Sequence, residues 1–264
     1  MNVIIESPSN PRIKELVKIR ELPRRRKERG LFFVEGAEDL LVLLKAGRKV
    51  EEVYGSSVSM TNPQSQELLN QCADKEIPVI ETSMVAQEKA SYRSVGSDLI
   101  GLVKTWNLDL DKDSAWGKGP LVVLDEVEKP GNLGAILRSV EAFGAAGLIL
   151  SEPHVDFFNP NVVRASRGLL GRVPVARGTK EEVLQWLENS NRMIWATSSK
   201  SSQELGKEVL PDALAFVFGS EQEGLGEFWQ KAVKKWIKIP MKGTASSLNL
   251  NVSVGCLLYE SNRG

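Results

Sequence analysis

Polar residues and glycines gather at three turns of the sequence, each directly after a short apolar run. In the first turn, Asn132 follows Pro130 and Gly131, and Arg138 comes six residues later. This spacing is nearly two turns of a helix, so the long Arg138 side chain can fold back over a helix end that Asn132 caps. The pattern is typical of an anion or nucleotide site, although a plain capped helix with a surface arginine explains the same residues.

The second turn, at residues 219–225, is an acidic loop bounded by glycines. Gly219 and Gly224 let the backbone approach a ligand closely, and Glu221 places a carboxylate between them. The loop differs from the G-x-G-x-x-G fingerprint, which argues against a dehydrogenase. It also lacks the lysine of a phosphate-binding loop. Its carboxylates suit a ribose hydroxyl or an amino group better than a phosphate.

The third turn, at residues 239–249, is polar, contains Gly243 and runs directly into the last apolar segment. Ser247 is expected to cap the helix that begins there. Helix capping alone explains this turn as well as a ligand site does, so its interpretation depends on the two other turns.

The elements that must position these turns are predicted from apolar periodicity. After residue 119, strands are expected at 121–124, 148–150, 173–176, 193–197, 215–218 and 237–239, and helices at 132–143, 160–170, 227–234 and 248–260, with another helix opening at Thr179. Strands that alternate with helices form βαβ units and a parallel sheet covered on both faces. Ligands bind beyond the carboxyl ends of such strands, where all three turns lie.

The first 105 residues also alternate between helices and strands. A helix is expected from Pro11 to Leu22, after which Pro23 interrupts it and leaves the basic cluster at 24–27 exposed. Strands are expected at residues 31–34, 50–54, 77–80 and 99–103, and helices at 40–44 and 64–73. The fold class is therefore α/β, with a small domain at 1–105, a linker at 106–118 and a second domain at 119–264.

Charge is balanced overall, with 34 basic and 34 acidic residues, but it is unevenly distributed. Residues 1–30 carry nine Lys or Arg against four Glu, a net charge of +5. Such a segment attracts a polyanion such as RNA, because each phosphate contact releases counterions. A solvated helix face is the alternative explanation of these charges.

The rest of the composition favours a cytoplasmic protein. No apolar run approaches the roughly 20 residues needed to span a bilayer, and the N-terminus does not read as a signal peptide. Cys72 and Cys256 are expected to be buried free thiols. His154 is the only histidine and the sequence has no Cys/His cluster, so a metal site is not expected. The short apolar runs give no reason to expect a membrane partner.

Together the three turns resemble the signature motifs of the SpoU (TrmH-type) RNA ribose 2′-O-methyltransferases of the SPOUT superfamily. The resemblance rests on P-G-N-x-G-x-x-x-R at residues 130–138, F-G-x-E with a following G-L at 218–225, and I-P-M-x-G with S-L-N at 239–249. Leu250 and Asn251 stand where the family usually has valine and serine. Asn251 is expected to affect helix packing rather than chemistry. Residues 7–55 look like the substrate-binding domain of rRNA-directed members.

The resemblance implies a small ribosomal-protein-like α/β RNA-binding domain followed by a trefoil-knotted, parallel-sheet methyltransferase domain. It implies a homodimer that binds S-adenosylmethionine in the knot and methylates a ribose 2′-hydroxyl of structured RNA. The basic N-terminal domain favours rRNA as the substrate. A tRNA 2′-O-methyltransferase and a non-catalytic RNA-binding or ribosome-assembly protein on the same fold are the alternatives.

The resemblance also implies residue roles. Arg138 acts on the ribose, either as a general base or as a grip on the neighbouring phosphate. Asn132 would fix Arg138 or the ribose, and Glu221 and Ser247 would hold Arg138 and shape the catalytic site. Asn249 would support the knot and the cofactor loop. The residues expected at the cofactor are Thr197, Gly219, Ile239, Met241 and Leu248. The basic residues expected at the RNA are Arg12, Lys14, Arg24, Arg25, Arg26, Lys27 and Arg164.

Overall fold

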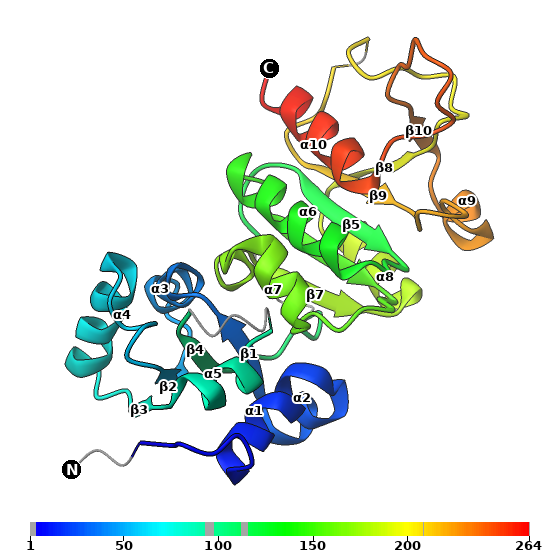
Figure 1. Ribbon diagram of the computed structural model, residues 1–264. Coiled ribbons are helices and arrows are strands. Elements are labelled where there is room, and N and C mark those ends of the chain that lie inside the picture. The colour runs from blue at the N-terminus through cyan, green and yellow to red at the C-terminus, as the bar shows by residue number, and fades with distance from the viewer. Residues whose placement is uncertain (1–3, 93–97, 112–115, 208, 264) are drawn as a thin grey trace. The chain divides into compact units, whose positions relative to one another are not determined.

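The computed structural model describes residues 4–92, 98–111, 116–207 and 209–263, which form two compact units (Figure 1). The first unit comprises the chain up to Trp106 together with Asp156–Arg172. The second unit comprises Asn107–Val155 and the chain from Val173 onward. Within the described ranges, no helix has the length and apolar character needed to cross a membrane.

A four-stranded mixed sheet forms the centre of the first unit, in the order β1-β4-β2-β3. Strand β4 is antiparallel to β1 and β2, and β3 is parallel to β2. The elements of this unit are α1 (Pro11–Glu21), α2 (Pro23–Arg29), β1 (Leu31–Glu35), α3 (Ala37–Lys45), β2 (Val50–Gly55), α4 (Pro63–Asp74), β3 (Val79–Glu81), α5 (Met84–Ala90), β4 (Ile100–Lys104), α7 (Pro160–Ser166) and the 3-10 helix η1 (Leu169–Gly171).

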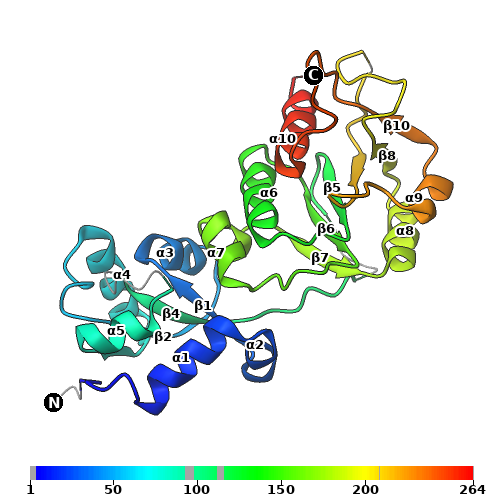
Figure 2. The same ribbon diagram turned by 45° about the vertical axis from the view of Figure 1, so that its right-hand side comes forward.

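Helices cover both faces of this sheet (Figure 2). Ile13 and Leu16 of α1 share a buried cluster with Phe33 of the sheet. On the other face, Gly101 leaves room for Leu40 of α3, because a Cβ at Gly101 would lie 2.3 Å from a Leu40 methyl carbon. The helix α5 was not predicted, since its seven residues carry too little periodicity to stand out from a loop.

The basic cluster at residues 24–27 forms a second helix, α2, and only part of it is exposed as predicted, namely Arg24 and Lys27. Arg26 lies on the inner side of α2 and is buried. Its Nε donates to Asp156 Oδ2 at 2.7 Å, and its Nη1 donates to the carbonyls of Ile19 and Arg20. These carbonyls belong to the last turn of α1, which lacks helical partners. Arg26 therefore stabilises the first unit and is not available to RNA.

Residues 156–172 pack in the first unit, although the sequence placed them in the second domain. Helix α7 contacts β1, and η1 contacts α3. The predicted helix at 160–170 ends early, at Ser166, because Arg167 and Gly168 both adopt left-handed backbone conformations. Gly168 also approaches Asp39 so closely that a Cβ would lie 2.6 Å from the Asp39 carbonyl oxygen.

The second unit contains a six-stranded, wholly parallel sheet in the order β10-β8-β9-β5-β6-β7, which confirms the predicted α/β architecture. Val123 in the middle of β5 lies beside Ile149 of β6 and Val217 of β9. The elements are β5 (Leu121–Asp125), α6 (Pro130–Ala142), β6 (Gly147–Ser151), β7 (Val175–Gly178), α8 (Lys180–Asn189), β8 (Met193–Thr197), β9 (Leu214–Phe218), α9 (Glu227–Ala232), β10 (Lys235–Ile237) and α10 (Leu250–Ser261).

The strands of this sheet are apolar and buried between two layers of helices. Trp186 of α8 and Trp229 of α9 share one core cluster with Val217 of the sheet. Helices α6 and α10 pack against each other (Figure 1). The linker predicted at 106–118 is partly ordered by the sheet, because Leu108 and Leu110 exchange backbone hydrogen bonds with Arg177 of β7. The trefoil knot stays a prediction.

Two predicted boundaries near the end of the chain were displaced. Strand β10 ends at Ile237, two residues before its predicted end. Helix α10 begins at Leu250 and is capped by Asn249 rather than Ser247, because the Asn249 side chain accepts from the backbone N–H of Asn251. Of the two thiols expected to be buried, only Cys72 is, and its burial raises its pKa to about 11. Cys256 is half-buried.

Candidate active site

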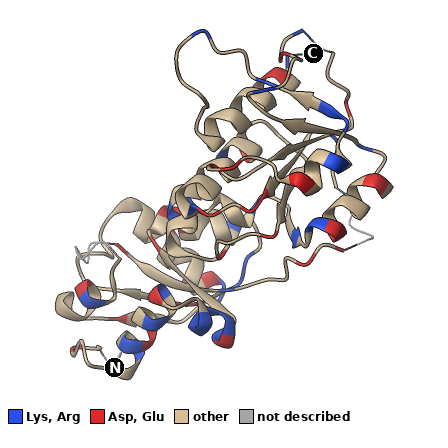
Figure 3. Cartoon of the chain, turned by 90° about the vertical axis from the view of Figure 1, so that its right-hand side faces the viewer, with Lys and Arg blue, Asp and Glu red and all other residues tan. Residues whose placement is uncertain are grey.

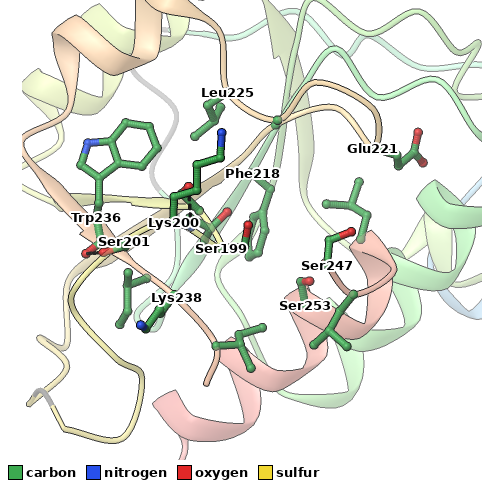
Figure 4. A pocket seen from close by; sticks show the side chains of 18 of the residues that line it. Ser199, Lys200, Ser201, Phe218, Glu221, Leu225, Trp236, Lys238, Ser247 and Ser253 are labelled. Atoms are coloured by element: carbon green, nitrogen blue, oxygen red, sulfur yellow. Dashed lines mark hydrogen bonds between the residues drawn. The ribbon is translucent and has the colours of Figure 1, made fainter. Parts of the chain in front are cut away.

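A cavity of about 820 Å³ opens at the carboxyl ends of β8, β9 and β10 (Figure 4). Apolar side chains and serines line it together, a mixture typical of sites for small organic ligands. The five residues predicted at the cofactor all line this cavity: Thr197, Gly219, Ile239, Met241 and Leu248. The five residues were expected from the family resemblance, and the cavity lies beyond the carboxyl ends of parallel strands, where ligands commonly bind.

The loop after β9 folds back on itself at the edge of the cavity. The backbone amides of Ser220 and Gly224 each donate to the carbonyl of the other, at 3.2 and 3.1 Å. A Cβ at Gly219 would lie 2.1 Å from the carbonyl carbon of Gly224, so this position requires glycine. Gly224 has a φ of +72°, which also favours glycine. The two glycines fix the loop that presents Glu221.

Three side chains from the three sequence motifs form one hydrogen-bonded chain. Asn132 donates from Nδ2 to Glu221 Oε1 at 2.5 Å, and its Oδ1 accepts from Nδ2 of Asn249 at 3.3 Å. Asn132 follows β5 and Glu221 follows β9, and these neighbouring strands mark the point where the strand order reverses direction. Ligands bind at such switch points in open parallel sheets.

The helix that carries Asn132 begins differently from the prediction. Helix α6 starts at Pro130 with Lys129 at the cap position, so Asn132 lies inside the first turn. Its side chain is free of the capping function and reaches Glu221 instead. The sequence identified the residue correctly as a polar group at this helix end but gave it the wrong partner.

Glu221 carries a buried oxygen that lacks a hydrogen-bond partner among the described residues, Oε2. The side chain is only 9% exposed, and the nearest charge is Nζ of Lys129 at 3.9 Å from Oε2. A buried carboxylate oxygen without a donor is costly. The geometry therefore leaves room for one more donor from a ligand or a moving side chain.

Arg138 lies exposed on α6, two turns beyond Pro130, and is not part of the cavity lining. The predicted contacts with Glu221 and Ser247 are absent, and Arg138 has no hydrogen bond or ion pair with any residue that the structure describes. Ser247 does line the cavity, as an exposed residue. Arg138 thus presents a guanidinium that is available to a phosphate.

The sequence interpretation missed a serine-rich loop that lines the far side of the cavity. Figure 4 shows Lys200, Trp236 and Lys238 opposite Glu221 and Ser247. The loop is held because the Ser201 hydroxyl donates to the carbonyl of Trp236 at 2.9 Å. The run of serines and Lys200 directly after the strand at 193–197 was the available signal, since the carboxyl-end rule applies there too.

The basic residues predicted at the RNA have different surroundings. Arg12, Lys14, Arg24 and Lys27 are exposed on α1 and α2, where Figure 3 shows basic and acidic residues side by side. Arg25 is half-buried and paired with Glu15 and Glu28, whose hydrogen bonds raise its pKa. Arg164 is exposed on α7. The basic surface available to RNA is therefore smaller than the sequence indicated. Acidic neighbours pair with some of the basic residues, and Arg26 is buried.

The fold and the site define an α/β protein with a nucleotide-sized cavity at the switch point of a parallel sheet. Residues 119–259 match the SpoU rRNA methylase family, and residues 10–101 match the MRM3-like substrate binding domain. The chain belongs to the SpoU rRNA methylase family.

Similar proteins cover nearly the whole chain. The 23S rRNA (adenosine(1067)-2′-O)-methyltransferase of Streptomyces azureus is 33% identical over 262 residues, 97% of this chain and 94% of that protein. A crystal structure of an RNA 2′-O ribose methyltransferase has a TM-score of 0.86 at 32% identity, covering 99% of this chain and 98% of the other. An AdoMet-bound rRNA methyltransferase from Sinorhizobium meliloti has a TM-score of 0.85 at 26% identity, with 99% and 97% coverage.

Proposed function

We propose that this protein transfers a methyl group from S-adenosylmethionine to a ribose 2′-hydroxyl of ribosomal RNA. The observation that carries the proposal is the hydrogen-bonded chain of Glu221, Asn132 and Asn249 beside the cavity. It joins all three family motifs at the switch point of the sheet. The similarity to 2′-O-methyltransferases over nearly the full chain supports the same reaction.

The cavity fits an adenosine-containing cofactor. Ile239, Met241 and Leu248 offer apolar side chains for the flat faces of a base, and the loop at 219–225 offers backbone groups at the rim. Thr197 is fixed by its hydroxyl, which donates to the carbonyl of Val217 at 3.2 Å. When bound, S-adenosylmethionine supplies a methyl group on a positively charged sulfur.

The remaining task of the protein is to orient the ribose hydroxyl. We assign Arg138 to the phosphate next to the target ribose, because a guanidinium is a fivefold donor without an acceptor at ordinary pH. Glu221 Oε2 then accepts the missing hydrogen bond, either from Arg138 or from the ribose. Positioning of this kind can supply much of a rate enhancement.

We also propose that the protein is a homodimer through α10. Val252 and Tyr259 are exposed on this helix, and the Tyr259 ring meets Phe143 of α6 edge to face. Leu257 of the same helix is 1% exposed and packs within its own chain, so it cannot form the interface. We therefore expect Tyr259→Glu to favour the monomer. A wild-type mass near 29.1 kDa in light scattering at micromolar concentration would contradict the dimer.

The test of the reaction uses tritium-labelled S-adenosylmethionine with unmodified 23S, 16S and transfer RNA transcripts. We expect label in rRNA and an alkali-resistant dinucleotide at one position, since a 2′-O-methyl group blocks cleavage there. A transcript with a 2′-deoxy nucleotide at that position is the matched control and should take up none. Label in tRNA alone would contradict the rRNA assignment, and label in a base would contradict the reaction.

A further inference from the structure

An aromatic ring and an arginine form a pair on the surface of the first unit, and neither residue belongs to the lining of the cavity in the second unit. Tyr92 lies just after α5 and is 39% exposed, although it is a large apolar ring. The Arg164 guanidinium carbon lies 5.2 Å from the centre of this ring. Both residues border a small hollow whose lining also includes Glu35 and Pro160.

Hydrogen bonds hold the Tyr92 ring in place despite its exposure. Its hydroxyl donates to Asn161 Oδ1 at 2.9 Å, and its backbone N–H donates to Glu35 Oε2 at 3.0 Å. The second oxygen of Glu35 is bound by the hydroxyl of Ser91. A ring fixed in this way loses little conformational freedom when a ligand stacks on it.

The segment that carries Arg164 is fixed to the same unit. The Asn159 side chain caps α7, and the helix packs on β1. Arg26 anchors the preceding turn through Asp156. The guanidinium of Arg164 reaches Asn161 Oδ1 only at 3.5 Å, so most of its donors are uncommitted. The amide Nδ2 of Asn161 also lacks a partner among the described residues.

We infer that Tyr92, Arg164 and Asn161 form a subsite for one unstacked nucleotide of the RNA substrate. This inference rests on the proposed function. An exposed aromatic face stacks on any base, and an arginine plane extends such a stack. The groups that Arg164 and the Asn161 amide nitrogen leave free are donors, so the subsite favours a base edge rich in acceptors, such as the N7 and O6 of guanine. Sequence-specific RNA recognition commonly uses splayed bases of this kind.

The first test compares Tyr92→Leu with Tyr92→Phe on the rRNA transcript that the wild type methylates. Loss of the ring should raise KM for RNA roughly ten- to a hundredfold, because stacking contributes strongly to each bound base. The phenylalanine variant keeps the ring but loses the bond to Asn161, so its rise should be smaller, roughly two- to fivefold. Cofactor affinity by calorimetry and the thermal midpoint report on folding. A KM for Tyr92→Leu within twofold of wild type overturns the subsite.

The second test separates stacking from charge. Arg164→Gln is compared with Arg167→Gln, an exposed arginine three residues away that pairs with Glu38 at 3.8 Å. If the subsite exists, Arg164→Gln should raise KM for RNA in the wild-type background but not in a Tyr92→Leu background, since the two side chains hold the same base. Arg167→Gln should show no such dependence on Tyr92. Equal effects of both arginine variants in either background would mean a phosphate contact alone, which contradicts the subsite.

The last readout does not depend on methylation. Ultraviolet cross-linking of wild-type protein to rRNA should join a guanine to Tyr92, as read by mass spectrometry of the digested complex. If cross-linking occurs without methyl transfer, the proposed function fails and the subsite stands. If methyl transfer occurs and all cross-links avoid Tyr92, the subsite fails and the proposed function stands.

Discussion

The carboxyl edge of the parallel sheet is open to a ligand in one half and closed by side chains in the other. Beyond β8, β9 and β10 the edge opens into the cavity. Beyond β5, β6 and β7 it is closed by Lys180, which follows β7 and opens α8. Both halves have the strand geometry that favours ligand binding. The difference between them must therefore come from their side chains.

In the closed half, the polar groups satisfy one another. The Lys180 ammonium lies 2.6 Å from Glu126, 3.7 Å from Asp125 and 3.8 Å from Glu152. Asp125 also accepts from the Ser151 hydroxyl at 2.7 Å. Burial alone would lower the pKa of Lys180, but its hydrogen bond to Glu126 and the carboxylate charges outweigh this and raise it.

In the open half, a polar group is left over. Glu221 Oε2 lacks a hydrogen-bond partner among the described residues, and glycines rather than side chains fill the turn. The closed half instead tolerates Glu126 and Glu152 at φ angles of +54° and +43°, which Lys180 helps to hold. The half in which the polar side chains bond to one another is therefore closed, and the half that leaves a polar group without a partner stays available to a ligand.

The largest expected effect comes from removing the Arg138 guanidinium, which we assign to the phosphate of the substrate. Arg138→Ala should lower the rate of methyl transfer by roughly a hundredfold to a thousandfold, because one positioned charge commonly contributes that much. Cofactor affinity should hardly change, since Arg138 is outside the cavity lining. Arg138→Lys should fall between, as a point charge without the planar fork. Turnover of Arg138→Ala near the wild-type value would remove Arg138 from the mechanism.

Filling the glycine turn should close the open half. Gly219→Ala forces a Cβ to within 2.1 Å of Gly224, so the loop must shift by an amount that costs about 1–3 kcal/mol. We expect cofactor affinity to fall roughly tenfold or more in calorimetry. Gly226→Ala is the matched control, because a Cβ there meets nothing within 4 Å. Equal affinities of the two variants would show that the turn does not shape the site.

Opening the closed half should affect stability rather than binding. Lys180→Met leaves three carboxylates without their cation and should lower the free energy of unfolding by about 1–3 kcal/mol at neutral pH. Folding raises the pKa of Lys180, so its charged form stabilises the fold fully at pH values below the ordinary lysine pKa. This stabilisation is lost as the pH rises through the pKa of Lys180 in the folded state. Denaturant midpoints of wild type and variant should therefore converge above about pH 10.5. A constant difference from pH 7 to pH 11 would contradict this explanation.

The strand ends could be predicted from the sequence because they depend on local patterns. Apolar runs followed by polar turns identified the strands, and parallel pairing then brings the turn residues to one edge. Thr197, Gly219 and Met241 meet in the cavity for that reason. The serine loop at 198–201 obeys the same rule and was missed only because it matches no glycine or acidic pattern.

Partners far apart in the sequence could not be predicted in the same way. Asn132 bonds Glu221 across 89 positions, and Arg26 bonds Asp156 across 130. Nothing local distinguishes Arg26 from the arginines beside it, since all four basic residues at 24–27 occupy one short helix. Burial is set by where the helix docks, which depends on the whole first unit.

The smallest expected effect concerns the basic residues of α2 in the first unit. Their ion pairs can be compared with the cluster around Lys180 in the closed half. Arg24 is 91% exposed in its side chain, although its Nε lies 2.7 Å from Glu28 Oε1, and Lys27 is exposed. Arg25 is half-buried between two glutamates, and Arg26 is buried. Replacing Arg24 and Lys27 with Gln should reduce the slope of log affinity for RNA against log salt by at most about 0.7–0.9 per lost phosphate contact. Stability should barely change, because exposed charges contribute little to folding.

Arg26→Gln is the control that separates this prediction from a general loss of charge. Its guanidinium holds Asp156 and the end of α1, so the variant should lose stability without reducing the salt slope. Affinity of rRNA would be measured by filter binding between low and moderate salt for both variants. If Arg24→Gln with Lys27→Gln leaves the slope at the wild-type value, α2 makes no phosphate contact. The electrostatic attraction to RNA would then have to come from Arg12, Lys14 and the basic residues of the second unit.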